Sequence, residues 1–195
     1  MLILMDIDGV ILHAHDGFGA DMREDTQWKG DDAAFFEQLF QDSGYLESLA
    51  GRTEFSEVLG RLMAEFDNPC TQAAFMKWWC HDLVKNTELV DWLRSAPAEV
   101  VLASNQERSR RDAIANSLSG LDFYTASYFS CDVGYAKPDA KFFQHILSDR
   151  RANPEEVWFV DDSLTNVDAA RCLGVNGLHY ESNDQFLKDI GRVLA

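Results

Sequence analysis

The sequence predicts an α/β fold, in which a Rossmann-like parallel sheet is flanked by helices and carries an inserted helical-bundle cap. Short apolar runs alternate with amphipathic stretches at the start of the chain and again over its second half, a pattern typical of parallel sheets with crossover helices. Between these two regions the periodicity is helical only. The length of 195 residues suits one domain that carries an insertion.

The elements of the sheet follow from the apolar runs and from the signals between them. Runs short enough to be buried strands lie at Leu2–Met5, Val100–Ala103, Tyr128–Ser130, Val157–Val160 and Gly177–Tyr180. Amphipathic stretches predict helices at Glu107–Leu118, Asp139–Leu147, Thr165–Leu173 and Asp184–Val193. Pro138 suits the first position of the second of these helices, and Gly174 is a natural stop after the third.

Residues 15–86 break this alternation, because no convincing strand is found in them. Apolar residues recur there at helical spacing, in groups that begin at Phe35, Phe55 and Phe75. We interpret the aromatic stripe of Phe75, Trp78 and Trp79 as packed core rather than as a ligand cage. The predicted organisation is an α/β catalytic core of residues 1–14 and 87–195, with a helical cap of residues 15–86 inserted after the first strand.

The composition excludes several classes of partner. A formal net charge of −16 would repel nucleic acid and anionic lipid, so neither is expected as a partner. The four cysteines are widely spaced without a C-x-x-C pair, which favours reduced thiols over disulfides or zinc. No basic leader and no apolar stretch of about 18 residues is present, so a soluble cytoplasmic protein is expected. Oligomeric state is not readable beyond a monomer or a small homo-oligomer.

Polar residues gather at the ends of the predicted strands. In a parallel α/β sheet, ligands bind beyond the carboxyl ends of the strands. The residues expected at that edge are Asp6, Asp8, Ser104, Asn105, Asp161 and Asp162, with Lys137 before the helix that follows the third strand. Four carboxylates packed together repel one another unless a cation binds or protons are taken up. A site rich in carboxylate oxygens suits Mg²⁺.

The same edge offers what a phosphoryl group requires. A divalent cation offsets the acidic field and polarises phosphoryl oxygens, and Lys137 adds a positive charge. Helix N-termini after Ser104-Asn105 and after Asp161-Asp162 offer backbone N–H donors. Two carboxylates two residues apart can divide the labour of hydrolysis, one attacking phosphorus and the other moving protons.

These residues resemble the four motifs of the haloacid dehalogenase superfamily of phosphatases. The first motif, D-x-D-G-[TV], stands at residues 6–10; the second is Ser104; the third is Lys137; the acidic fourth is Asp161-Asp162. The resemblance implies that Asp6 is the nucleophile and a metal ligand, and that Asp8 is the general acid and base with its carbonyl on the metal.

The resemblance implies further roles for the later motifs. Ser104 and the amide of Asn105 would bind the phosphoryl group, and Lys137 would stabilise it and orient Asp6. Asp162 would ligate Mg²⁺ directly, Asp161 more through water, and Asn166 would support them.

The insertion resembles the small helical cap of the first subclass of this superfamily. Residues 52–56 resemble the loop that reaches from such a cap to the substrate, so Arg52 is a candidate substrate contact, although Thr53 stands where the pattern often has glycine. His13 and His15, just past the first motif, are interpreted as hinge or capping residues. The Ser-Asn second motif and the cap also resemble small sugar-phosphate phosphatases.

The expected function is therefore a Mg²⁺-dependent phosphatase that hydrolyses a small phosphorylated metabolite, such as a sugar phosphate, through an aspartyl-phosphate. Two alternatives stay open. The first is a 2-haloacid dehalogenase-type hydrolase, which needs neither a metal nor the second acid. The second is a phosphate- or metal-binding module without turnover, in the manner of a receiver domain, which would lack the cap and the acid at position 8.

Overall fold

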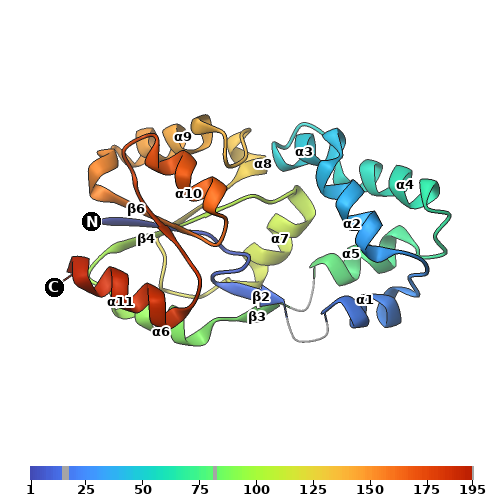
Figure 1. The fold of residues 1–195 in the computed structure, drawn as a ribbon, viewed down its shortest axis with the longest axis horizontal. Helices are drawn as coiled ribbons and strands as arrows, with labels where there is room; N and C mark the ends of the chain where they lie inside the picture. Colours follow the sequence, from blue (N-terminus) through green and yellow to red (C-terminus); the bar gives the residue numbers. More distant parts are fainter. Residues whose placement is uncertain (15–17, 81–82, 195) are drawn as a thin grey trace.

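A five-stranded parallel sheet forms the centre of the larger part of the molecule, with strand order β5-β4-β1-β6-β7 (Figure 1). The structure is a computed structural model that describes residues 1–14, 18–80 and 83–194. The strands are β1 (Leu2–Met5), β4 (Glu99–Ser104), β5 (Ala126–Phe129), β6 (Val157–Asp161) and β7 (Asn176–His179). The predicted fold class, a Rossmann-like parallel sheet flanked by helices, is confirmed.

The central strand β1 is apolar at every position because both of its faces are covered. Its odd-numbered residues Ile3 and Met5 pack into one cluster, which includes residues of α6 (Thr87–Ser95), α7 (Arg108–Ser117) and α11 (Asn183–Leu194). Leu2 and Leu4 pack into another, with residues of α9 (Ala140–Arg150) and α10 (Leu164–Arg171). Figure 1 shows these two layers of helices on opposite sides of the sheet.

Two local expectations at the end of β5 are wrong. The strand predicted at Tyr128–Ser130 is β5, which begins two residues earlier, at Ala126, and ends at Phe129. Ser130 lies outside the strand and begins the single turn α8 (Ser130–Val133). The Oγ atom of Ser130 accepts a hydrogen bond from the N–H of Gln106 at 2.9 Å, which ties this turn to the end of β4. Pro138 does not open a helix: it follows a cis peptide bond, and α9 begins at Ala140 with Asp139 as its N-cap. A 3-10 turn, Pro154–Glu156, precedes β6.

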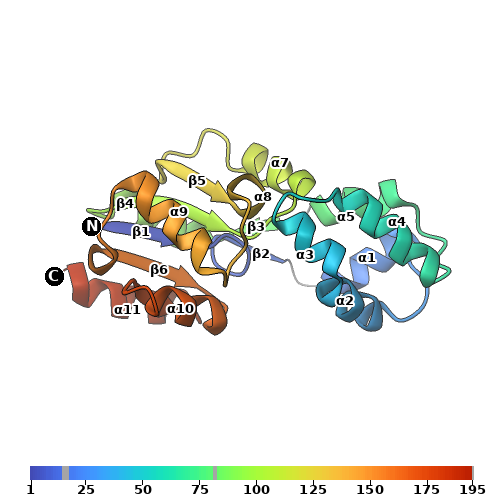
Figure 2. The same ribbon diagram turned by 90° about the horizontal axis from the view of Figure 1, so that it is seen from above.

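Helices form the smaller part of the molecule, at the far end from both chain termini (Figures 1 and 2). They are α1 (Phe18–Thr26), α2 (Asp32–Gln41), α3 (Ser43–Leu49), α4 (Phe55–Glu65) and α5 (Gln72–Cys80). Their shared core is rich in aromatic rings, with Phe35 and Phe75 fully buried and 5.7 Å apart between ring centroids. Burial of rings of this size dominates the stability of a small bundle.

A two-stranded antiparallel ribbon joins the two parts. It pairs β2 (Leu12–Ala14) with β3 (Leu83–Lys85). The expectation that residues 15–86 contain no strand is therefore wrong at Leu83–Lys85. Three residues are too few for a periodic signal, and β3 exists because β2 lies beside it rather than through its own sequence pattern.

Within the described residues, no helix combines the length and the apolar composition needed to cross a membrane.

Candidate active site

The carboxyl end of β1 lies between those of β4 and β6, because β1 pairs in parallel with both strands. The N–H of Asp6 donates to the carbonyl of Val160 at 2.9 Å, which continues the pairing one residue past β1. Asp6 therefore lies beside the ends of β4, which stops at Ser104, and β6, which stops at Asp161. The strand order alone brings these three residues to one edge of the sheet.

Lys137 lies between two carboxylates at this edge. Its Nζ atom is 2.9 Å from Oδ1 of Asp6 and 2.6 Å from Oδ2 of Asp161, and it donates to the carbonyl of Ala103 at 2.9 Å. Asn105 holds the backbone of Lys137: its side-chain amide donates to the Lys137 carbonyl and accepts from the Lys137 N–H, both at 2.8 Å. The Lys137 side chain is only 1% exposed, so these ion pairs are shielded from water.

The charges at this edge do not balance. Burial, reinforced by the charge of Asp161, raises the pKa of Asp6 to about 8, although Lys137 opposes the shift. Burial also acts to raise the pKa of Asp161, but Lys137 outweighs it and holds that pKa below its ordinary value. Burial acts to lower the pKa of Lys137, and the two carboxylates reverse this. A further positive charge is therefore needed to keep both aspartates ionised at neutral pH.

Three carboxylates are close enough to share a cation. Oxygen atoms of Asp6, Asp161 and Asp162 all lie within 4.8 Å of one another. Burial and the charge of Asp161 raise the pKa of Asp162, as expected for like charges held together. The Asp161 oxygens also accept hydrogen bonds from the Ser163 N–H at 2.8 Å and from Nδ2 of Asn166 at 3.1 Å. An all-oxygen set of this kind fits Mg²⁺.

Gly9 makes room for Asp162. A Cβ atom at position 9 would lie 2.1 Å from Oδ2 of Asp162, and the residue has φ +78°. Only glycine adopts this backbone conformation without strain, and only glycine leaves the carboxylate its space. The glycine of the first motif therefore leaves room for one of the three carboxylates that could bind a metal ion.

The Asp8 carboxylate, at the rim of the site, is held by two residues that the sequence reasoning missed. Its Oδ2 atom accepts from Nε2 of Gln106 at 2.8 Å, and its Oδ1 accepts from the Arg110 guanidinium at 3.0 Å. Gln106 also donates to Oγ of Ser104 at 3.0 Å. No local pattern in the sequence marks them, since Gln106 lies before α7, which begins at Arg108, and Arg110 lies in the first turn of that helix.

Arg52 is not brought into the acidic cluster. Its guanidinium pairs with Glu47 at 3.1 Å and donates to the carbonyl of Gly134 at 3.0 Å, so it links the helical part to the segment before Lys137. Arg108 makes the opposite link, from α7 to the carbonyl of Gly51 at 2.6 Å. Gly51 permits this close packing, because a Cβ there would lie 2.1 Å from the carbonyl oxygen of Cys131.

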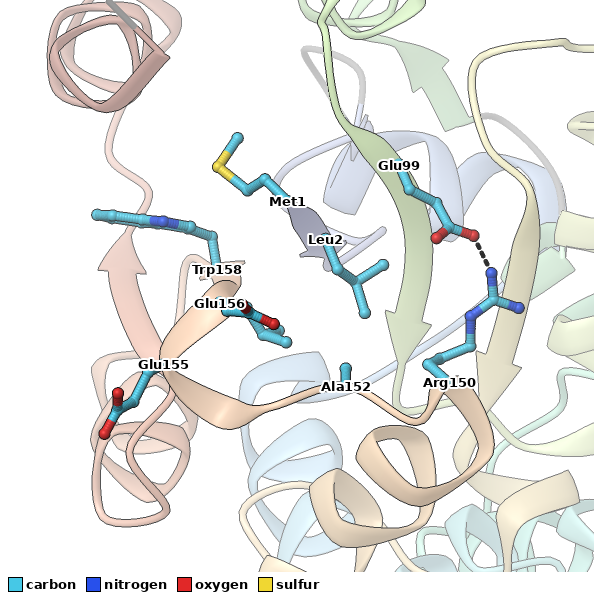
Figure 3. Close-up of a pocket in the computed structure, with 9 residues that line it drawn as sticks. Met1, Leu2, Glu99, Arg150, Ala152, Glu155, Glu156 and Trp158 are labelled. Atoms are coloured by element: carbon cyan, nitrogen blue, oxygen red, sulfur yellow. Dashed lines mark hydrogen bonds and ion pairs between the residues drawn. The ribbon is translucent and has the colours of Figure 1, made fainter.

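Two pockets lie at opposite ends of the α/β part, and the first of them borders the acidic cluster. A polar groove of about 570 Å³ runs from Gly9 and Asp162 past His13 to Asn86 and Tyr180. His13 lies 3.3 Å from the Asn86 amide, beside the ribbon, while His15 lies outside the described residues. The second pocket, of about 490 Å³, is at the opposite end of the sheet, beside Met1 and the Glu99–Arg150 ion pair (Figure 3). It contains none of the predicted site residues.

Both a protein-family model and individual curated proteins match parts of this chain. A family model described as haloacid dehalogenase-like hydrolase matches residues 1–174. The sesquiterpene phosphatase astK of Aspergillus oryzae is 40% identical over 58 residues, which make up 30% of this chain and 30% of that protein. The matched stretches take up less than a third of the length of the first curated relatives.

Solved structures match over nearly the whole chain. The haloacid dehalogenase family enzyme bt-2542 of Bacteroides thetaiotaomicron, in complex with magnesium and inorganic phosphate, has a TM-score of 0.75 at 21% identity, covering 93% of this chain and 94% of that one. The L-2-haloacid dehalogenase of Xanthobacter autotrophicus has a TM-score of 0.69 at 16% identity, covering 100% and 84%. At these identities the likeness concerns the fold.

Proposed function

We propose that this chain, an enzyme that belongs to the haloacid dehalogenase-like hydrolases, is a Mg²⁺-dependent phosphatase of small phosphorylated metabolites. The observation that carries the proposal is the buried Asp6–Lys137–Asp161 ion-pair cluster with a second acid, Asp8, two residues after Asp6. This arrangement supplies a nucleophile, a cation for the phosphoryl group and a proton carrier within one edge of the sheet.

In the first step, an Oδ atom of Asp6 attacks phosphorus and forms an acyl phosphate. The bond between phosphorus and the ester oxygen breaks, and Asp8, which must enter this step protonated rather than as the carboxylate paired with Arg110, gives its proton to that oxygen, so the alcohol leaves neutral. Lys137 already contacts Asp6, which holds the nucleophile in place and offsets negative charge on the phosphoryl oxygens. The hydroxyl of Ser104 and the N–H of Asn105 are the proposed donors to those oxygens.

In the second step, a water molecule attacks the phosphorus of the acyl phosphate. Asp8 takes a proton from this water, the bond between phosphorus and the Asp6 oxygen breaks, and inorganic phosphate leaves. Both aspartates return to their starting states, so the cycle balances. Mg²⁺, held by Asp6, Asp162 and the Asp8 carbonyl with Asp161 nearby, would supply charge neutralisation and polarise the phosphoryl group.

Residues 15–86 are proposed to act as a cap that shields this chemistry from water and selects the substrate. Arg52 is retained as a candidate substrate contact after a change in the position of the cap. The substrate proposed is a small phosphorylated metabolite, with a sugar phosphate as the first class to test. The name of the sesquiterpene phosphatase among the relatives adds phosphorylated terpenoids as a second class. We propose a cytoplasmic monomer or small homo-oligomer without nucleic-acid or membrane partners.

A 2-haloacid dehalogenase is the second candidate, because solved enzymes with that activity share the fold. Such a reaction needs a carboxylate nucleophile alone. The oxygen cluster of Asp6, Asp161 and Asp162 and the acid at position 8 would then have no task. The cluster therefore favours phosphoryl transfer.

The test is a phosphate-release screen over sugar phosphates, phosphorylated terpenoids and other phosphometabolites, with Mg²⁺ and with a chelator. Halide release from 2-chloropropionate is measured in parallel. We expect Mg²⁺-dependent phosphate release, and its complete loss in Asp6→Asn with an unchanged circular dichroism spectrum. Full turnover by Asp6→Asn, or chelator-resistant halide release by the wild type, would refute the proposal.

A further inference from the structure

We propose that Arg110 is a positioning residue for the reaction, which holds the Asp8 carboxylate in place and does so only while the cap is docked. This inference rests on the proposed phosphatase function and adds to it a physical link between cap and acid. It concerns a residue on α7, outside the four motifs.

The contact between Arg110 and Asp8 is two-pronged. One terminal nitrogen of the guanidinium donates to Oδ1 of Asp8 at 3.0 Å, and Nε donates to Oδ2 at 3.3 Å. A planar guanidinium that contacts both oxygens fixes the rotation of the carboxylate as well as its position. Asp8 needs such support, since its side chain is 41% exposed and lies at the rim of the site.

The same guanidinium also contacts the cap. The second terminal nitrogen of Arg110 donates to the carbonyl of Trp79, in the last turn of α5, and the guanidinium lies 5.1 Å from the centre of the Trp79 ring. The last carbonyls of a helix carry partial negative charge and favour a cation. The Arg110 side chain is only 9% exposed, so the guanidinium is shielded from water although the Asp8 side chain is not. Withdrawal of α5 would remove one partner and open the other to solvent.

Gln106 extends the link to the phosphoryl site. Its side-chain amide donates to Asp8 at 2.8 Å and to Ser104 at 3.0 Å. A continuous set of contacts therefore runs from the Trp79 carbonyl through Arg110, Asp8 and Gln106 to Ser104. Because general acid catalysis requires the proton donor within hydrogen-bond reach of the leaving oxygen, the position of the cap decides whether Asp8 is ready to act.

The test exploits the chemistry of the leaving group. Phenyl phosphate and p-nitrophenyl phosphate have similar shapes, but phenolate is the stronger base and needs protonation more. We expect Arg110→Gln to lose at least about tenfold in kcat/KM on phenyl phosphate, and much less on p-nitrophenyl phosphate, because kcat/KM reports the step in which the leaving group departs and a misplaced general acid slows that step. In a double-mutant cycle, Arg110→Gln should add no further loss to Asp8→Asn, because it acts through Asp8.

A matched control lies on the same helix. Arg111 pairs with Asp112 and Asp132, so Arg111→Gln removes an arginine charge of α7 without touching Asp8 or Trp79. Hydrogen exchange over the last turn of α5 supplies a readout that does not depend on turnover. We expect faster exchange in Arg110→Gln and wild-type exchange in Arg111→Gln. If Arg110→Gln fails to fold, Arg110→Lys keeps the charge but loses the two-pronged contact, and should show the same selectivity for leaving group.

The outcomes separate the two proposals. No phosphate release by the wild type from either aryl phosphate or from any phosphometabolite of the screen would refute the phosphatase function itself. With an active wild type, an equal loss on both substrates, no loss, or a loss that adds to that of Asp8→Asn would overturn the role of Arg110. Unchanged exchange at the end of α5 would overturn its link to the cap.

Discussion

Replacing Gly9 with alanine should weaken Mg²⁺ binding at the proposed site while the protein still folds. The new Cβ would lie 2.1 Å from Oδ2 of Asp162. Since carbon contacts need about 3.5 Å, the carboxylate would have to retreat by about 1.4 Å. Mg²⁺ demands ligands at about 2.0–2.1 Å in near-ideal octahedral geometry, so a movement of that size removes the ligand. We expect Mg²⁺ affinity to fall by about 10–100-fold, as when groups that orient metal ligands are lost.

Gly120→Ala supplies the control for backbone strain. Gly120 has φ +79°, against +78° for Gly9, and a Cβ at position 120 would meet nothing within 4 Å. Each substitution should cost about 1–2 kcal/mol of unfolding free energy through the left-handed conformation. Only Gly9→Ala should weaken Mg²⁺ binding in isothermal titration calorimetry. Wild-type affinity in a folded Gly9→Ala variant would refute the assignment of Asp162 as a metal ligand.

Three further predictions concern the buried charges and the helical core. Because burial raises the pKa of Asp6 from 3.8 to about 8, the stabilisation that comes from its bound proton is fully present below about pH 4 and is lost as the pH rises to about 8. The melting temperature of the metal-free protein should therefore fall over that range, less so in Asp6→Asn, and Mg²⁺ should bind more tightly; an identical fall in Asp6→Asn would contradict the assignment. Lys137→Met should lower the free energy of unfolding, measured in urea, by about 3–5 kcal/mol, because it leaves two buried carboxylates without a positive partner. The double variant Lys137→Met with Asp161→Asn should recover part of that loss. An unchanged unfolding midpoint in Lys137→Met would count against the ion pairs. Phe75→Ala, at a fully buried ring, should cost about 3–5 kcal/mol in the same assay, whereas Phe40→Ala, at a ring 49% exposed, should stay within about 1 kcal/mol; equal costs would argue against the packing described.

The sheet was predictable from the sequence because its central strands are buried on both faces. Leu2–Met5 and Val157–Val160 must then be apolar at every position, and an acidic pair directly after such a run is conspicuous. The contact of Lys137 with Asp6 was expected only from the resemblance to a known family. No sequence pattern predicts it, because it depends on the hydrogen bond from Asn105 to the backbone of Lys137, 32 residues further along the chain.

The rest of the candidate site depends on contacts that no local pattern encodes. Arg110 contacts Asp8 across 102 residues of sequence, and the contact forms only because α7 starts beside the end of β1. Arg52 reaches the carbonyl of Gly134, 82 residues away, rather than the acidic cluster. β3 likewise needs β2 as a partner before it becomes a strand. Such features follow from the packing of segments that lie far apart in the sequence.

The ribbon of β2 and β3 makes the helical part an exchangeable module. Ala14 is paired with Leu83, so the chain leaves the core and returns to it at neighbouring points. Antiparallel strands so paired can be closed by a turn of about two residues, which would delete the bundle while leaving the five-stranded sheet intact. Evolution can therefore exchange one insertion for another, and alter what is recognised, without rebuilding the carboxylates of the proposed active site.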